Sequence, residues 1–153
     1  ARVAGAGRDA LGALPLEARH GEAGDVGRHG CDRAQQGPGV RALQGDHRAQ
    51  SSLGFLYLKG LGVDQDDALA ASWYRRAAEG GRPEAQFFLG TLYFLGRGVR
   101  QDFVEAHLWC ELALSNGMTE GLDCMSDAAL HLTPAQRTEA DRRLVEWRNR
   151  PKR

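Results

Sequence analysis

The 153-residue sequence is poor in aromatic side chains and carries no net charge. Phe, Trp and Tyr make up 7% of the residues, and the formal charge at pH 7 is zero. Because nucleic acid and anionic lipid attract proteins that carry an excess of positive charge, this balance argues against both kinds of partner. No run of about 18 apolar residues occurs, so we predict no membrane-spanning helix.

Cysteine is also scarce. Cys31, Cys110 and Cys124 lack the spacing of a disulfide framework or a zinc site. Their scarcity favours reduced thiols in the cytoplasm, but a Cys110–Cys124 bridge stays open as an alternative. A periplasmic or secreted setting also stays open if an N-terminal signal is missing. The stretch HGC at 29–31 has no predicted scaffold around it, and we predict neither a metal nor a cofactor.

The first 48 residues differ from the rest in composition and in apolar periodicity. They hold ten of the 20 glycines and no Phe, Trp or Tyr, and no apolar period persists in them. Such a stretch buries too little apolar surface to offset the entropy of ordering it. We therefore predict a segment over 1–48 that is mostly disordered or loosely helical, irregular or degenerate, and a folded domain over 49–153.

The folded part contains two copies of a sequence repeat. AQSSLGFLYLKGLGVDQDDALAASWYRRAAEGGRPE (49–84) aligns without a gap with AQFFLGTLYFLGRGVRQDFVEAHLWCELALSNGMTE (85–120), and 16 of the 36 positions are identical. Self-similarity at a period between about 20 and 50 residues is typical of a solenoid. The upstream stretch VRALQGDHRAQ (40–50) resembles the end of a copy, as if an earlier repeat were degenerate or absent.

Each copy predicts two antiparallel helices. Ala49, Leu53 and Tyr57 recur at helical spacing, and the glycines that follow are expected to end the first helix and turn the chain. An aspartate then caps the second helix. Its inward stripe comprises Ala70, Trp73 and Ala77 in the first copy and Ala106, Trp109 and Ala113 in the second. A phosphate-binding loop would need a preceding strand and a different continuation, so we interpret the glycines as turns.

The shared pattern A-x-x-x-L-G-x-L-Y-x-x-G-x-G-V-x-x-D-x-x-x-A-x-x-W resembles the Sel-1-like repeat, a relative of the tetratricopeptide repeat. The resemblance covers 49–120 and implies an all-α fold, a short α-solenoid of antiparallel helix pairs. It also implies a scaffold or adaptor that binds a protein or peptide, with no chemistry common to the family. Cys110 departs from the pattern, since the first copy has Tyr74 there.

The remaining residues predict a capping helix pair over 121–150. Gly121 stands 36 residues after Ala85, and the sequence LTPAQ replaces the glycine turn. Thr133, Pro134 and Gln136 together have the spacing of a capping box with proline at the first helical position. A polar closing pair is what the end of a solenoid requires.

No catalytic group is predicted. Cys110 lies at a core position and is expected to be buried and inert, and His107 is expected to be a partly exposed packing residue. Cys124 and His131 could form a nucleophile pair, but no orienting group accompanies them. The alternative function is a hydrolase related to cysteine-rich repeat proteins that are similar to β-lactamases. Those relatives have a cysteine pair in each unit, which this sequence lacks.

The predicted partner-binding surface lies on the first helices of successive units, which line the inner curve in repeats of this kind. Positions identical in both copies are committed to the core, so positions that differ are available for recognition. This reasoning selects Ser51, Phe55, Leu58 and Lys59 in the first unit, Phe87, Thr91, Phe94 and Leu95 in the second, and Asp123 and Asp127 in the third.

Overall fold

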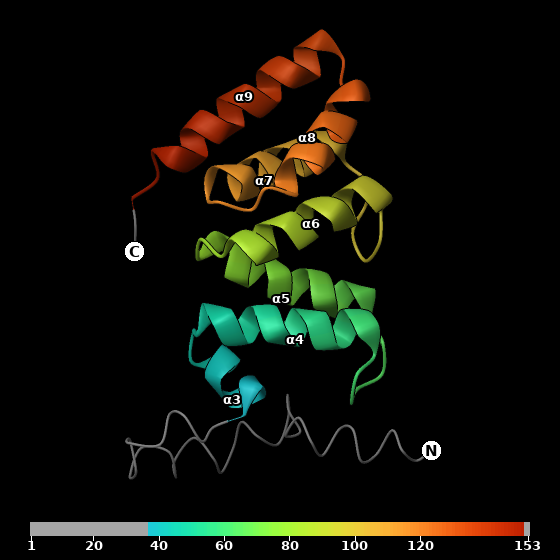
Figure 1. Cartoon of the computed structure of the whole chain (residues 1–153), viewed down its shortest axis with the longest axis vertical. Coiled ribbons are helices and arrows are strands. Elements are labelled where there is room, and N and C mark those ends of the chain that lie inside the picture. Colours follow the sequence, from blue (N-terminus) through green and yellow to red (C-terminus); the bar gives the residue numbers. More distant parts are fainter. Residues whose placement is uncertain (1–36, 152–153) are drawn as a thin grey trace. The chain divides into compact units, whose positions relative to one another are not determined.

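A computed structural model describes residues 37–151 of the chain (Figure 1). Throughout this part of the chain the secondary structure is helical and no strand occurs, which confirms the predicted all-α class. The chain divides into two compact units, Ala1–Ala77 and Ala78–Arg153. The predicted irregular segment lies outside the described residues as far as residue 36.

The first unit contains α3 (Pro38–Leu43), α4 (His47–Lys59) and nearly all of α5 (Asp67–Glu79). Its core is a cluster of Ala42, Ala49 and Leu53, against which Leu56, Val63 and Trp73 pack. Trp73 is only half-buried, and the Arg76 guanidinium lies 4.8 Å from the centre of its ring. The predicted inward stripe is thus confirmed for Ala70 and Ala77, which are fully buried, and only in part for the tryptophan.

The folded domain begins earlier than the predicted boundary at residue 49. Both α3 and the first turn of α4 lie before it, and the Asp46 carboxylate caps α4 by accepting from the amides of Arg48 and Ala49. The prediction failed because α3 has six residues, of which only Gly39 and Ala42 are buried, too few to show an apolar period.

The helix α3 occupies the place of the end of a preceding second helix. The Gln50 side-chain amide donates to the Ala42 carbonyl at 3.1 Å. The same bond, at the same length, runs from Gln86 to Ala78, 36 residues later in both donor and acceptor. This repetition supports the interpretation of 40–50 as the remnant of an earlier repeat.

The second unit contains α6 (Pro83–Leu95), α7 (Phe103–Ser115), α8 (Gly121–Leu130) and α9 (Pro134–Arg148). Within it α7 is the central helix, since α6, α8 and α9 all pack against it (Figure 1). Eight of its 13 residues are buried, among them Trp109 and Cys110. The core of this unit is therefore built around α7.

The turns between paired helices repeat in detail. Gly60 and Gly96 end α4 and α6 with φ of 70° and 69°, in the left-handed region that favours glycine. Asp66 and Asp102 then cap α5 and α7 through their carboxylates. These turns and caps were predicted from the sequence and are confirmed.

The closing helices α8 and α9 follow the predicted capping pair. Thr133 and Gln136 form the full capping box, with Pro134 at the start of α9. Ala140 and Leu144 are its buried residues, and the Arg143 guanidinium reaches Glu105 on α7 at 2.6 Å. Among residues 37–151, no helix combines the length and apolar character needed to cross a membrane.

Candidate partner-binding surface

In the first unit, the predicted surface residues lie on α4 but are not equally accessible. Phe55 is 40% exposed, and Lys59, one turn later on the same face, is exposed as well. Ser51 is half-buried. Leu58 is buried, with 7% of its surface exposed, so its side chain is unavailable to a partner and the expectation for it is corrected.

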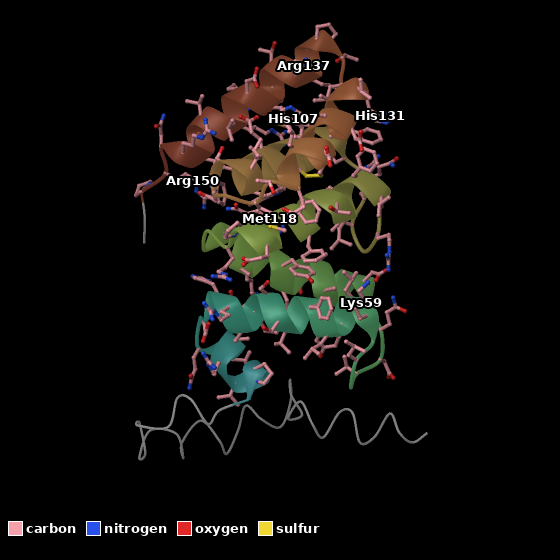
Figure 2. The ribbon with its side chains drawn as sticks, in the orientation of Figure 1. Lys59, His107, Met118, His131, Arg137 and Arg150 are labelled. Carbon is pink, nitrogen blue, oxygen red and sulfur yellow. A yellow bond between two sulfur atoms is a disulfide. The ribbon has the colours of Figure 1, made fainter. Side chains whose placement is uncertain are left out.

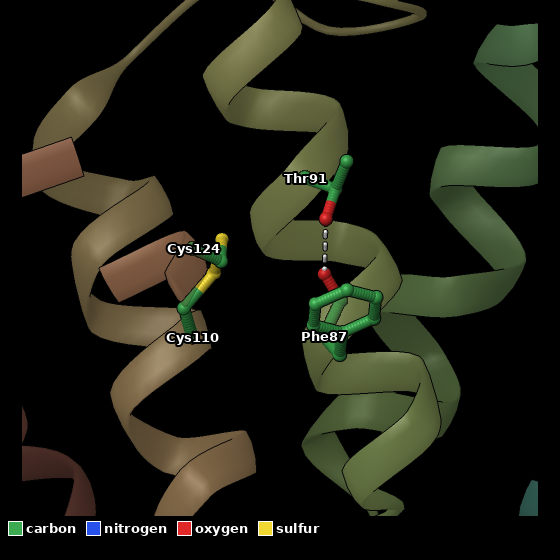
Figure 3. The surroundings of a disulfide bond; sticks show 4 residues. All are labelled: Phe87, Thr91, Cys110 and Cys124. Carbon is green, nitrogen blue, oxygen red and sulfur yellow. Dashed lines mark hydrogen bonds between the residues drawn. A yellow bond between two sulfur atoms is a disulfide. The ribbon is translucent and has the colours of Figure 1, made fainter. Parts of the chain in front are cut away.

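In the second unit, Phe87 and Thr91 lie on α6 near the point where α7 and α8 are joined (Figure 3). Both side chains are half-buried. The Thr91 hydroxyl donates to the Phe87 carbonyl of its own helix at 3.0 Å. The Phe87 ring meets Phe88 edge to face, with centres 5.6 Å apart. Phe87 therefore offers apolar area, while the hydroxyl proton of Thr91 is already engaged.

Phe94 belongs to a cluster of three rings that come from three helices. It lies at the end of α6, Phe103 is the first residue of α7, and His131 directly follows α8. The Phe103 and His131 rings are stacked, with centres 4.3 Å apart and planes 13° apart. Phe94 meets both edge to face, at 5.5 Å and 5.7 Å. Figure 2 shows His131 at the end of α8, where this cluster forms.

Two leucines that are sequence neighbours of these rings are highly exposed. Leu95 follows Phe94 in the chain and is 52% exposed, and Leu130 precedes His131 and is 83% exposed. We call Phe94, Leu95, Phe103, Leu130 and His131 the aromatic patch. Clustered apolar side chains that remain in solvent are typical of binding surfaces.

Three members of the aromatic patch were not predicted from the sequence. Phe103, Leu130 and His131 lie outside the first-helix positions compared between the copies. A signal was present for Phe103, because a phenylalanine directly after the capping Asp102 stands where the first copy has Asp67. A signal was present for Leu130 and His131 as well, because they stand 36 residues after Phe94 and Leu95, in the register that selected Asp123 and Asp127.

The predicted acidic pair, Asp123 and Asp127, is exposed on α8. The two residues are four positions apart and so lie on one side of the helix. They share α8 with Leu130 at its C-terminal end. A partner that contacts the aromatic patch and follows α8 would thus meet these carboxylates.

The cysteines differ from the main expectation. Cys110 on α7 and Cys124 on α8 form a disulfide, with Cα atoms 5.8 Å apart (Figure 3). Reduced thiols were expected, whereas the bridge was only the open alternative; the burial of Cys110 is confirmed. Because its sulfur is bonded, Cys124 presents no free thiolate that could attack a substrate. The suggested Cys124–His131 nucleophile pair is therefore not assembled, and His131 stacks on Phe103 instead.

His107 is more buried than predicted. It lies on α7, and its Nδ1 has no hydrogen-bond partner, with the nearest carboxylate that of Glu111 at 3.8 Å (Figure 2). Burial lowers the pKa of His107 below its ordinary value. The negative charges of Glu111 and Asp141 act against this shift, and the Arg137 charge adds to it. His107 is therefore a core residue whose burial disfavours its protonated form.

The described residues contain no group of three or more His, Cys, Asp or Glu side chains arranged to hold a metal ion. The predicted metal candidates at 29–31 lie outside this part of the chain. The site that the structure does present is a surface of exposed apolar side chains.

Comparisons with known proteins agree with this architecture. Residues 47–81 and 83–118 match the family model of the Sel1 repeat, each about two residues ahead of the predicted boundaries. A comparison with curated proteins returns no match.

Solved structures supply two similar proteins. One is a protective antigen present in uropathogenic Escherichia coli strains and displaying an SLR fold; it is 36% identical, with a TM-score of 0.67 over 69% of this chain and 23% of that one. The other is a Sel1 repeat protein from Oxalobacter formigenes, 32% identical, with a TM-score of 0.54 over 68% of this chain and 45% of that one. This chain thus spans less than half the length of either protein. Together with the turns, caps and paired helices, these matches show that the chain contains two Sel1 repeats and belongs to the Sel1-repeat proteins.

Proposed function

We propose that the chain is a scaffold that binds a protein or peptide partner, and that the aromatic patch is the centre of the binding surface in the second unit. Sel1 repeats are typically found in protein-interaction scaffolds. The observation that carries the proposal is Leu130, which is 83% exposed and directly precedes His131, one of two stacked rings. A partner side chain that covers it would remove apolar surface from water on both molecules.

The partner's chemistry follows from the charges around the patch. Asp123 and Asp127 lie exposed on α8, leading up to Leu130. A peptide with one large apolar residue and a lysine or arginine a few positions away would complement both features. In the first unit, Phe55 beside Lys59 offers a second, separate contact of mixed apolar and basic character.

The proposal does not include catalysis. The bond to Cys110 occupies the sulfur that a thiol hydrolase would need. One bridged pair in the second unit also falls short of a pair in every unit, which is the pattern of the hydrolase-like relatives considered above.

Peptides selected from a random library displayed on phage, with the oxidised chain as bait, provide the test. Leu130→Ser should weaken the selected peptides at least tenfold, about 1.4 kcal/mol, because the exposed leucine contributes contact area and little stability. The matched control is Val145→Ser on α9, an equally apolar residue that is 55% exposed and lies outside the patch.

Two outcomes would contradict the proposal. If Leu130→Ser and Val145→Ser bind the selected peptides as tightly as the parent, the patch is not the binding surface. If Leu130→Ser unfolds at a much lower temperature than Val145→Ser, the leucine is structural and its effect on binding is indirect.

A further inference from the structure

The helix α8 is held in the second unit by very little apolar burial. Only Gly121 and Ala128 of its ten residues are buried, whereas eight residues of α7 are. The helix that follows, α9, buries only Ala140 and Leu144. A short helix in water is marginal without strong tertiary packing, so a covalent attachment adds substantially to what holds α8 on α7.

That attachment is the disulfide. Cys110 is fully buried in the middle of α7, and Cys124 lies half-buried on α8. One turn before Cys124, Gly121 brings α8 directly onto α7: a Cβ at that position would lie 2.6 Å from the Cys110 carbonyl oxygen and 2.9 Å from the Leu114 nitrogen. The bond and the glycine contact therefore fix the same stretch of α8 against α7.

The end of α8 supplies part of the aromatic patch. Leu130 is the last residue of the helix, and His131 stacks on Phe103 directly after it. The Arg137 guanidinium, on α9, donates to the Ala129 carbonyl at 3.0 Å and so ties α9 to the same end of α8. If α8 leaves α7, Leu130 and His131 leave Phe94 and Phe103.

We propose that the Cys110–Cys124 disulfide is a redox gate on the aromatic patch, which is intact in the oxidised chain and taken apart when the bond is reduced. The inference rests on the proposed function only for its effect on binding; the release of α8 stands on the contacts above. An oxidising compartment assembles the surface, and a reducing one dismantles it.

A dithiol reductant supplies the electrons. Its thiolate attacks the sulfur of Cys124, the more exposed of the two cysteines, the S–S bond breaks, and the Cys110 sulfur leaves as a thiolate that takes up a proton. The second thiol of the reductant then attacks the mixed disulfide and releases Cys124. Overall the protein bond gains two electrons and two protons, and the dithiol becomes a disulfide.

Hydrogen exchange of the full chain, with and without dithiothreitol, tests the release. The bond joins residues 14 apart, and closing a loop of about that size corresponds to roughly a hundredfold in an opening equilibrium. We expect the amides of α8 to exchange about a hundredfold faster after reduction, and those of α4 to keep their rates. In the Cys124→Ser variant, the amides of α8 should exchange at the rates of the reduced parent. Adding dithiothreitol should not change these rates. Cys31→Ser, the matched control, should respond as the parent does.

Unchanged exchange in α8 on reduction would overturn the gate. So would an equal increase across α6, α7 and α8, since the bond would then support the whole unit instead of controlling one helix. The effect of reduction on binding is measured separately, with the phage-selected peptides. If Leu130→Ser weakens binding of the peptides but reduction does not, the proposed redox gate is wrong and the proposed binding surface is supported. If α8 opens but Leu130→Ser binds normally, the gate stands and the proposed surface is wrong.

Discussion

The two repeats place different side chains against the same glycine. In the first, Gly54 on α4 faces the ring of Tyr74, and a Cβ on the glycine would lie 2.9 Å from that ring. In the second, the equivalent Gly90 on α6 faces the sulfur of Cys110 and the backbone of α7. The first repeat fills the contact with a large aromatic side chain, and the second fills it with one half of a disulfide.

The difference shows how a repeat adapts to its neighbour. Tyr74 is fully buried and contributes a large, closely packed aromatic ring. Cys110 is a much smaller side chain, but it is bonded to α8, which buries only two of its ten residues. The covalent link thus compensates for the weak hydrophobic contact of a polar closing pair.

The largest expected effect is the difference in stability loss between substitutions of the two repeat tryptophans. Trp109 is 2% exposed, donates to Glu105 at 3.1 Å and meets Trp147 edge to face at 4.8 Å, whereas Trp73 is half-buried. Trp109→Ala should lower the free energy of unfolding by about 3–5 kcal/mol, and Trp73→Ala by less. Urea titration of both variants under oxidising conditions measures this.

Equal losses of unfolding free energy in the two alanine variants would contradict the difference between the repeats. Both repeats would then bury their second helices to the same depth. Trp147→Phe serves as the control for the edge-to-face contact. It keeps an aromatic ring beside Trp109 and should retain most of the stability.

A smaller effect is expected at the paired glycines. At Gly90 a methyl group would meet the disulfide sulfur and, at 3.2 Å, the Ala106 oxygen and the Cys110 nitrogen, which cannot move without shifting α7. Gly90→Ala should destabilise by about 1–3 kcal/mol. Gly54→Ala should cost less, because its three nearest contacts are all with the Tyr74 ring and none is with the backbone of the neighbouring helix. Thermal melts of the two variants side by side decide the order, and a larger loss at Gly54 would contradict it.

The smallest expected effect is on the stability of the protein at acidic pH. The pKa of His107 is lowered in the folded chain, so the unfolded chain binds a proton more readily as the pH falls through about 6.5. Stability is therefore complete above that value and decreases below it. His107→Gln should flatten this part of the curve of melting temperature against pH. A variant whose curve parallels that of the parent between pH 7 and 5 would show that other groups cause the decrease.

Most of the fold could be predicted because it is encoded locally and twice. Helical spacing, positive-φ glycines and capping aspartates each act within a few residues, and they recur in both copies. The short α3 was anticipated only as the end of a degenerate copy at 40–50, because six residues hold too few apolar positions to show a period.

The candidate site was harder to predict because exposure depends on tertiary packing. Leu58 and Phe94 occupy the same repeat position and differ between copies, yet one is buried and the other half-exposed. Variation between two apolar residues is compatible with either state. The disulfide could not be assigned since its two cysteines lie on separate helices, and only the packing of α8 on α7 brings them together.

The bond from Gln50 to the Ala42 carbonyl, repeated from Gln86 to Ala78, has a consequence for protein engineering. Donor and acceptor stand on consecutive helices that flank a positive-φ glycine, Gly45 in one case and Gly81 in the other. A cassette cut from Asp46 to Gly81 therefore includes one donor, Gln50, and one acceptor, Ala78. Copies of this cassette inserted in tandem would each supply the amide that the preceding copy needs and the carbonyl that the next one needs. The hydrogen bond at each junction of such an array would thus be retained.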